Sequence, residues 1–214
     1  MSKQDYPQLA LTKVFVADAH STDGTREIAR SFDAHLNIEI IPGGLPSVGR
    51  NAGAKRACTP YVLFMDADIE LQDPTLLRRA MQTVRRRKLQ CLTTNIWCSN
   101  GNLRDHILYL GSDLVQYFAS WTKPFATGMF MLFEKEKFDQ LGGFNEKALY
   151  AEDYLLSKRV SPRRFGILRG SVSTTNRRFQ KMGHFKIVRM FLKTAFNTFN
   201  EQYFLRDHEY WKEA

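Results

Sequence analysis

Short apolar segments alternate along the chain with segments in which apolar residues recur at helical spacing. Residues 11–18, 37–41, 61–65 and 90–97 have the pattern of strands, and the run "YVLFM" is the most continuously apolar of them. The segments between them have the pattern of helices, at residues 25–32, 48–57 and 75–88. This alternation predicts an α/β fold with a mostly parallel sheet and helices on both faces.

Three acidic residues follow the predicted strands. Asp18 ends the first strand, and Asp66 and Asp68 come directly after the apolar run at 61–65. Ligands bind at the carboxyl ends of strands in such sheets, so these acids lie where a ligand is expected. Two neighbouring carboxylates repel each other, and a divalent cation that prefers oxygen ligands, Mg²⁺ or Mn²⁺, relieves the repulsion. The alternative is a helix cap, a role for which Asp73 is better placed.

Length and composition describe a single folded domain. The chain has 214 residues, of which 43% are hydrophobic and 25% charged. No apolar run approaches the roughly 20 residues that span a bilayer, and the N-terminus does not resemble a signal peptide. The three cysteines are few and widely spaced, which is typical of a reducing compartment. We therefore expect a cytoplasmic protein, with a position at the inner face of a membrane as an open alternative.

The positive charge is concentrated in the last third of the chain. The net charge is +9, and residues 151–214 hold 13 Lys and Arg against six Asp and Glu. Such an excess favours polyanionic partners, which include nucleic acid, an anionic membrane face and a phosphorylated small molecule. Simple solubility is the plain alternative.

Two segments have an apolar side. Residues 184–204 predict an amphipathic helix whose apolar side holds Phe185, Val188, Phe196 and Phe199, with Lys186, Arg189 and Lys193 as its cations. We expect this helix to pack on the domain, with peripheral membrane contact as the alternative. The segment at 103–125 is equally apolar on one side. We expect it to be core, with a place beside an acceptor as the alternative.

Five motifs occur in a characteristic order. They are "VADAHSTDGT", "GRNAGAKRA", "MDAD", "ATGMFMLFEKEKFDQLGGFNE" with "YAEDYLLSKRV", and "TTNRRFQKMG". Together they resemble the nucleotide-diphospho-sugar glycosyltransferases of the large inverting family 2, over nearly the whole chain. The resemblance implies a GT-A (Rossmann-like) fold. It also implies transfer of a sugar from a nucleotide diphosphate, expected to be a UDP-sugar, to an acceptor hydroxyl with inversion.

The resemblance assigns a donor site to the first half of the chain. Asp18 matches the acid that binds the nucleotide base, although a simple turn residue is its alternative. Arg50 and Asn51 match a motif near the ribose and phosphates, and an exposed surface position is equally open for Arg50. Asp68 matches the direct metal ligand, and Asp66 contacts the ribose or the water shell of the metal.

The second half supplies the remaining roles. Asp153 matches the catalytic base, which takes the proton from an acceptor hydroxyl, and Glu152 lies on the acceptor side. These two acids also suit the first turn of a helix, which is compatible with catalysis. Arg177 and Arg178 match a basic-aromatic motif that closes over the diphosphate. The expected acceptor is a sugar or a lipid-linked molecule.

One departure from the family concerns the start of the domain. Family members begin with a strand and helix of roughly 30 residues, for which this sequence has no counterpart before "QDYP". We therefore expect an N-terminally truncated version of the fold, with strands left unpaired. We divide the single domain into a nucleotide-sugar part (1–100), an acceptor and catalytic part (101–183) and a C-terminal helix and tail (184–214).

Two other classes of function remain open. A nucleotidyltransferase of related fold would use the same acidic pair but release pyrophosphate. A basic polyanion-binding module, or an inactive nucleotide-binding domain, would explain the charge of the last third. Nucleic acid is not an expected partner, because the acids at the strand ends would repel its phosphates.

Overall fold

The structure is a computed structural model, and it describes residues 1–206. Its strands are β1 (Lys13–Asp18), β2 (Asn37–Pro42), β3 (Tyr61–Phe64), β4 (Cys91–Cys98), β5 (Met131–Glu134) and β6 (Phe165–Thr174). The α-helices are α1 (Thr25–Arg30), α2 (Pro46–Arg56), α3 (Leu76–Arg87), α4 (Leu103–Ala119), α5 (Lys135–Gln140), α6 (Glu152–Ser157), α7 (Arg177–Met182), α8 (His184–Phe196) and α9 (Glu201–Phe204). Short 3₁₀ turns at Leu9–Leu11 and Pro162–Arg164 precede β1 and β6.

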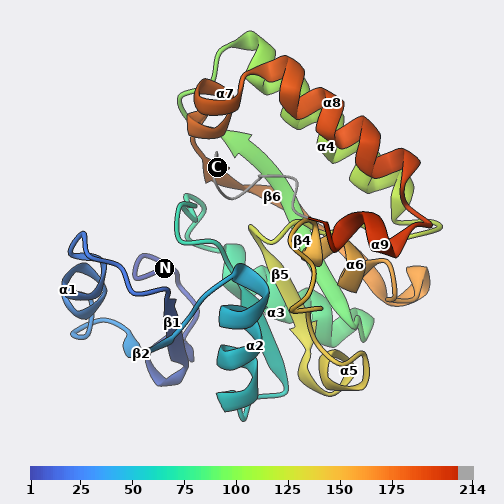
Figure 1. The fold of residues 1–214 in the computed structure, drawn as a ribbon. Coiled ribbons are helices and arrows are strands. Elements are labelled where there is room, and N and C mark those ends of the chain that lie inside the picture. Colours follow the sequence, from blue (N-terminus) through green and yellow to red (C-terminus); the bar gives the residue numbers. More distant parts are fainter. Residues whose placement is uncertain (207–214) are drawn as a thin grey trace.

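The strands form two sheets (Figure 1). β1 and β2 pair in parallel, and the second sheet has the order β3-β5-β4-β6. β5 is antiparallel to both of its neighbours while β4 and β6 are parallel, so β3, β4 and β6 run in one direction. The predicted α/β fold with a mostly parallel sheet is confirmed. Among residues 1–206, no strand of the first sheet pairs with a strand of the second.

Helices cover both faces of the four-stranded sheet. Side chains alternate between the faces of a strand, so Leu63 and Phe64 of β3 enter two different apolar clusters. Leu63 joins the cluster that α3 supplies, which also receives Val14 of β1 and Ile38 of β2. Phe64 joins the cluster that α5 and α6 supply through Phe138 and Leu156. The first cluster therefore joins the two sheets.

Glycine brings α2 close to β1. A β-carbon at Gly49 would lie 2.9 Å from the β-carbon of Ala17, closer than such atoms normally approach. Glycine at position 49 thus permits a close approach of α2 to β1. The contact fixes α2 against the end of β1, from where it presents Arg50 toward the second sheet.

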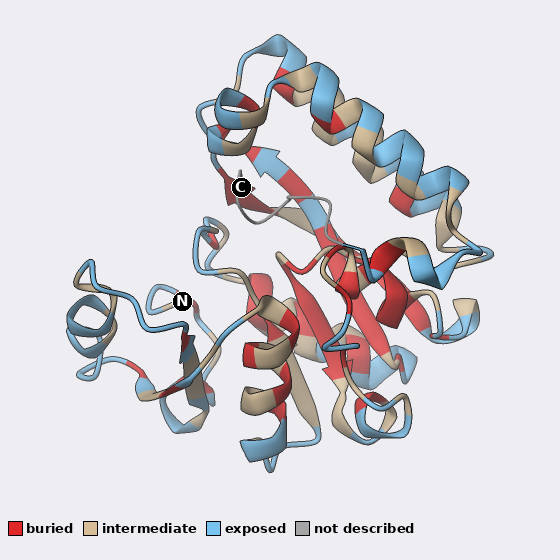
Figure 2. Cartoon of the chain, viewed as in Figure 1, coloured by how far each residue is buried: buried red, intermediate tan, exposed pale blue. Residues whose placement is uncertain are grey.

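The helix predicted at 184–204 packs on the domain through Ile187, which is buried, but not through the apolar side that the sequence indicated, and the prediction that 103–125 is core is wrong for its outer side. Phe185, Phe196 and Phe199 have exposed fractions of 81%, 86% and 86%, although Val188 is half-buried. On α4, which was expected to be core, Leu103 is 75% exposed and Phe118 is 60% exposed. An apolar side chain pattern defines a face but does not say what covers it. Figure 2 shows both helices beyond the sheet with pale, exposed outer sides.

The predicted helix at 184–204 is interrupted in the structure. α8 ends at Phe196, and α9 begins at Glu201 after a turn that contains Asn197 and Asn200. Among the described residues no helix is long and apolar enough to cross a membrane. The end of the predicted tail, residues 207–214, lies outside the described residues.

Candidate active site

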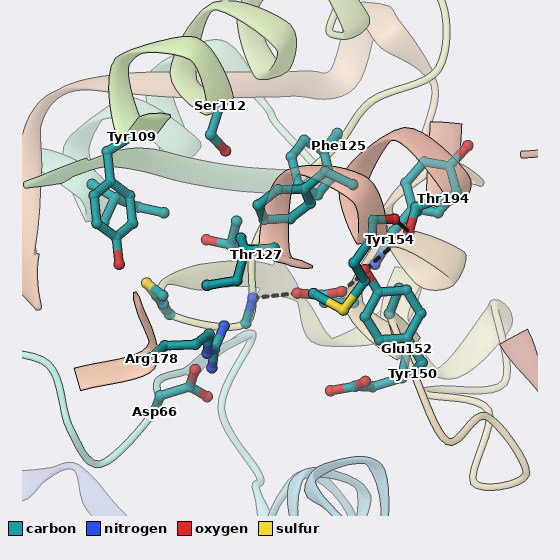
Figure 3. Close-up of a pocket in the computed structure, with 18 of the residues that line it drawn as sticks. Asp66, Tyr109, Ser112, Phe125, Thr127, Tyr150, Glu152, Tyr154, Arg178 and Thr194 are labelled. Carbon is teal, nitrogen blue, oxygen red and sulfur yellow. Dashed lines mark hydrogen bonds between the residues drawn. The ribbon is translucent and has the colours of Figure 1, made fainter. Parts of the chain in front are cut away.

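A pocket opens where the loop after β3 meets the segment before β5 and the start of α6 (Figure 3). Asp66 comes from the β3 loop, Thr127 and Gly128 from the segment before β5, and Glu152 and Asp153 from α6. The inner sides of α4 and α8 close the pocket with mainly apolar side chains, which include Tyr109, Ile187 and Met190. The pocket therefore brings together acids that are far apart in the sequence.

Arg50 connects the two predicted halves of the site. Its Nη2 donates to Oδ1 of Asp66 at 2.5 Å, and its Nη1 donates to Oε1 of Glu152 at 2.6 Å. Only 11% of the Arg50 side chain is exposed. Burial opposes the charge of the guanidinium, but the carboxylates of Asp66, Glu152 and Asp153 outweigh it and raise the pKa of Arg50. Of the two roles open for Arg50, an exposed surface position is therefore excluded.

Gly128 gives Arg50 the space to lie there, and sequence reasoning did not single it out. A β-carbon at Gly128 would lie 2.2 Å from Nη2 of Arg50, which two such atoms cannot tolerate. The main-chain N–H of Gly128 also donates to Oδ2 of Asp153 at 2.7 Å. Gly128 thus positions the arginine and the acid together. The only signal for it was its place in the motif "ATGMFM".

Asp153 lies half-buried in the first turn of α6. Its carboxylate accepts hydrogen bonds from the main-chain N–H groups of Gly128 and Tyr154, each at 2.7 Å. Burial, with a contribution from the negative charge of Glu152, raises the pKa of Asp153 to about 7, although Arg50 and the two hydrogen bonds oppose the shift. A carboxyl group with a pKa near neutrality suits proton transfer at physiological pH.

The residue before this turn has an unusual backbone. Ala151 adopts φ 51°, in the left-handed region that residues with a β-carbon rarely enter. Such conformations persist only where the surroundings enforce them, and they concentrate at functional sites. Here the left-handed residue starts α6 and sets the direction in which Glu152 and Asp153 leave the chain.

A second cavity adjoins the first and shares four lining residues with it: Asp66, Tyr109, Met129 and Arg178. Its volume is about 410 Å³, and its lining includes Asp68, Thr175 and Arg177. Nη2 of Arg177 donates to Oδ2 of Asp68 at 3.1 Å, and both side chains are largely exposed. The predicted phosphate-binding and metal-binding residues therefore meet at one cavity, whose size is typical of small-molecule sites.

The acids at the second cavity fit a divalent ion that a phosphate ligand helps to hold. Among residues 1–206 no group of three or more His, Cys, Asp or Glu is arranged to bind a metal. Mg²⁺ needs no such group, because it takes one or two protein carboxylates and completes its shell with water and substrate phosphates. Asp66 and Asp68, which both line this cavity, would supply those two carboxylates. His184 lines neither cavity, and its Nε2 contacts Oδ1 of Asp105 at 2.6 Å.

Asp18 lies at the end of β1 and lines neither cavity. Its carboxylate accepts hydrogen bonds from the main-chain N–H of Ser21 at 3.2 Å and from Nε of Arg26 at 2.6 Å. Hydrogen bonds from Ser21 and then from Arg26 lower the pKa of Asp18 to about 2. The structure therefore places Asp18 apart from the other predicted residues, in a turn that Arg26 closes.

Asn51 faces away from the cavities and organises the acceptor-side segment. Its Nδ2 donates to the carbonyl oxygen of Phe144 at 2.9 Å and to Oε1 of Glu146 at 2.8 Å. Its Oδ1 accepts from the main-chain N–H of Phe144 at 3.0 Å. Adjacent residues of α2 therefore have different tasks: Arg50 contacts the acids, and Asn51 holds the chain that leads to them.

Residues 4–142 match the family described as Glycosyl transferase family 2. This match spans well over half of the sequence, so the chain belongs to family 2 of the glycosyltransferases. Membership and the α/β architecture agree with the resemblance that the motifs carry.

Two relatives match short parts of the chain. Poly(ribitol-phosphate) beta-N-acetylglucosaminyltransferase TarS of Staphylococcus aureus (strain Mu50 / ATCC 700699) is 34% identical over 80 residues, which are 36% of this chain and 14% of TarS. Glycosyltransferase AglJ of Haloferax volcanii is 39% identical over 64 residues, which are 30% of this chain and 21% of AglJ. The matched regions are thus only a small part of either relative.

Solved structures show the same fold at low sequence identity. TarS 1–349 of S. aureus in complex with UDP superposes with a TM-score of 0.61 and 21% identity, over 81% of this chain and 54% of the other. Mannosyltransferase PcManGT from Pyrobaculum calidifontis, in complex with GDP-Man and Mn²⁺, has a TM-score of 0.62 and 18% identity, over 89% and 57% of the two chains. This chain therefore has the GT-A fold.

Proposed function

We propose that this glycosyltransferase moves a sugar from a nucleotide diphosphate, a UDP-sugar, to an acceptor hydroxyl, with inversion and with the help of a divalent cation. The observation that carries the proposal is the double ion pair of Arg50. Arg50 thereby connects Asp66 of the donor motif to Glu152 of the acceptor motif, which lies 102 positions after Arg50 in the sequence. Donor and acceptor groups therefore meet within one continuous site.

The donor diphosphate belongs in the 410 Å³ cavity. Arg177 and Arg178 line it, and charge-assisted hydrogen bonds from arginine to phosphate oxygens would stabilise the departing nucleoside diphosphate. Mg²⁺ or Mn²⁺ held by Asp68, with Asp66, would neutralise negative charge on the diphosphate. Asp68 and Arg177 contact each other at 3.1 Å, so each is within reach of the ligand that the other binds.

The acceptor belongs in the neighbouring pocket, where Asp153 serves as the base. A hydroxyl group is a weak nucleophile at neutral pH, and Asp153 takes its proton as the new bond to the sugar forms. The raised pKa of Asp153, about 7, makes it a stronger base than an ordinary carboxylate. Glu152 remains ion-paired to Arg50 and thereby holds the start of α6 in place.

The arrangement of the two cavities supports inversion. The diphosphate cavity and the acceptor pocket share Asp66, Tyr109, Met129 and Arg178, and their other lining residues differ. A sugar at this junction would have its leaving group on one side and the acceptor on the other. Direct displacement in that arrangement inverts the anomeric carbon, and no second carboxylate nucleophile is needed.

The comparisons favour the same donor class. The TarS structure holds UDP, and the mannosyltransferase structure holds GDP-Man with Mn²⁺. Both ligands contain a nucleoside diphosphate, and one of the two structures includes a divalent ion. A UDP-sugar with Mg²⁺ or Mn²⁺ is thus the first donor to test, and a sugar or lipid-linked molecule is the expected acceptor class.

Titration calorimetry tests the donor site directly. We expect the chain to bind UDP in the presence of Mn²⁺, and to lose most of this affinity without Mn²⁺ or in Asp68→Asn. Asp33→Asn, which changes an exposed acid that lines neither cavity, is the matched control and should bind as the unmodified chain does. UDP affinity that is indifferent to both Mn²⁺ and Asp68 would contradict the proposed metal site.

Product analysis separates the proposed reaction from nucleotidyl transfer. With a sugar nucleotide and an acceptor, a glycosyltransferase releases the nucleoside diphosphate, whereas a nucleotidyltransferase releases pyrophosphate. Release of UDP and an inverted anomeric configuration in the product, read by NMR, are the expected results.

A further inference from the structure

Helix α4 has a continuous apolar stripe on its outer side. Residues at intervals of three and four share one face of the helix, and each of them is at least half exposed: Leu103, Ile107, Leu110, Leu114 and Phe118. Trp121, also exposed, follows the end of α4 and continues the stripe. The opposite side of α4 lines the acceptor pocket through Tyr109 and Ser112. The stripe is therefore not the covered side of the helix.

Helix α8 runs alongside α4 and extends the same surface. The two helices are joined near their starts by the ion pair between Asp105 and His184. Beyond their ends they are joined by Lys123, whose Nζ lies 3.4 Å from the ring centroid of Phe199. We define the outer face as the α4 stripe together with the exposed apolar residues of the α8 segment, which are Phe185, Leu192, Phe196 and Phe199.

The charges on this outer face have a single sign. α8 contributes Lys186, Arg189 and Lys193 and contains no Asp or Glu. α4 contains two acids, and both turn inward. Asp105 is fully buried and bound to His184, and Asp113 accepts the main-chain N–H of Ile96 at 3.3 Å. The outer face therefore combines large apolar side chains with cations.

We propose that the outer face of α4 and α8 docks the protein on an anionic phospholipid bilayer. Apolar residues on one side of a helix enter the boundary between headgroups and acyl chains, and neighbouring Lys and Arg attract anionic lipids. A large exposed apolar patch is uncommon on a monomeric soluble protein and generally marks an interaction surface. The cations favour an anionic bilayer over a neutral one and over a second copy of the chain, whose own outer face would repel them.

The orientation fits a reaction at the membrane surface. The inner sides of the same two helices line the acceptor pocket, so docking would place this pocket close to the lipid headgroups. That consequence rests on the proposed function, whereas docking itself does not. Lipid binding can be measured without donor or acceptor, so failure of docking and failure of the proposed reaction are distinguishable.

Co-sedimentation of the full chain with vesicles tests the docking. We expect binding to vesicles of phosphatidylcholine mixed with phosphatidylglycerol, and at least about tenfold weaker binding to phosphatidylcholine alone, since each basic residue near an anionic surface contributes. Binding should weaken as NaCl rises from about 50 mM to about 500 mM, because salt screens exposed charges. Equal binding to both vesicle types, or none to the anionic ones, would overturn the proposal.

Three variants locate the contact. Two double variants should each reduce binding to anionic vesicles by about tenfold or more. One is Leu110→Asp with Phe118→Asp, and the other is Arg189→Glu with Lys193→Glu. The matched control is Leu11→Asp with Ile28→Asp, which changes residues that are 83% and 63% exposed elsewhere on the fold. This control should bind normally, and an equal loss in it would contradict the assignment.

Two further measurements show whether the outer face binds a bilayer or a second copy of the chain. Trp121 lies on the stripe, so quenching of tryptophan fluorescence by brominated lipids should fall sharply in Trp121→Phe. Analytical ultracentrifugation measures whether a second copy of the chain binds this face. A dimer that Leu110→Asp with Phe118→Asp converts to monomer would mean that the face joins two copies, and the proposal would fail. All variants change exposed residues, and circular dichroism melts should confirm that they fold.

Discussion

The two acidic pairs of the site have the same charges but opposite surroundings. One member of each pair, Asp66 and Glu152, forms an ion pair with Arg50. The remaining members differ: Asp68 has a side chain that is 44% exposed, whereas Asp153 is half-buried and held by two main-chain N–H groups. Different surroundings thus give chemically identical carboxylates different roles. An open carboxylate suits a cation, and an enclosed one with a raised pKa suits proton transfer.

The largest expected effect comes from removing the base. Asp153→Asn should lower the rate of sugar transfer by about 10²–10⁴-fold, the usual contribution of a general base. Binding of UDP with Mn²⁺ should stay within about threefold, because the nucleotide cavity does not include Asp153. The measurement is the initial rate of UDP release with acceptor, beside calorimetry of the same sample.

The pH profile of the same reaction provides the control for this role. A base with a pKa of about 7 is inactive when protonated, so kcat/KM of the unmodified chain should rise as pH increases through about 7. The residual rate of Asp153→Asn should lack that step. An Asp153→Asn variant with near-normal rates and an unchanged profile would remove Asp153 from the mechanism.

Arg50 offers the next largest effect, on stability. Arg50→Ala leaves Asp66 and the buried Glu152 without their partner, so the free energy of unfolding should fall by about 3–5 kcal/mol. Arg78→Ala is the matched control, because Arg78 pairs with Asp5 at an exposed position, where such pairs contribute about 1 kcal/mol or less. Urea unfolding measures both. Equal losses would show that burial adds nothing to the Arg50 pairs.

Gly128 gives a smaller effect in the same region. In Gly128→Ala the new methyl group displaces the guanidinium of Arg50, which should lower the free energy of unfolding by about 1–3 kcal/mol. Gly111→Ala is the control, since nothing lies within 4 Å of its β-carbon position in α4. It should stabilise the chain by about 0.5–1 kcal/mol. A neutral Gly128→Ala would mean that Arg50 can move without loss.

The local elements were predictable from the sequence because their signals are local. The helix predicted at 75–88 is observed as Leu76–Arg87, and the strand predicted at 61–65 as Tyr61–Phe64. Asp73 lies two residues before the N-cap of α3, which is Thr75, and its carboxylate accepts hydrogen bonds from Thr75 instead of capping the helix itself. The place of β5 between β3 and β4, antiparallel to both, depends on long-range pairing and had no such signal.

The site was predictable as a set of residues but not as a set of contacts. The motifs identified Asp66, Asp153 and Arg50, yet not that Arg50 joins the two acidic segments. The exposure of α4 and α8 was missed for a related reason. Helical spacing shows that apolar residues share a face, but whether the rest of the fold covers that face depends on tertiary packing. Gly128 was missed because its importance depends on a neighbour that is distant in sequence.

The smallest predicted effect concerns stability and pH, and its sign follows from the raised pKa of Asp153. Folding raises this pKa from about 4 to about 7, so the folded chain holds a proton that the unfolded chain releases. The stability associated with Asp153 is therefore fully present below about pH 4 and is lost as pH rises toward 7. The side chain that replaces Asp153 in Asp153→Asn is uncharged at every pH, so this variant does not lose stability as pH rises.

Asp153→Asn should accordingly gain stability relative to the unmodified chain between about pH 5 and pH 8, by roughly 2 kcal/mol. The asparagine NH₂ would face one of the two main-chain N–H donors, which lowers the free energy of unfolding by a similar amount at both pH values. The change in stability between the two pH values is therefore unaffected by this contact. Urea unfolding at the two pH values measures that difference, with the exposed Asp33→Asn as the control that should show none. A gain that is equal at both pH values would mean that Asp153 ionises as an ordinary carboxylate. The contrast between the two acidic pairs would then have to come from their contacts alone.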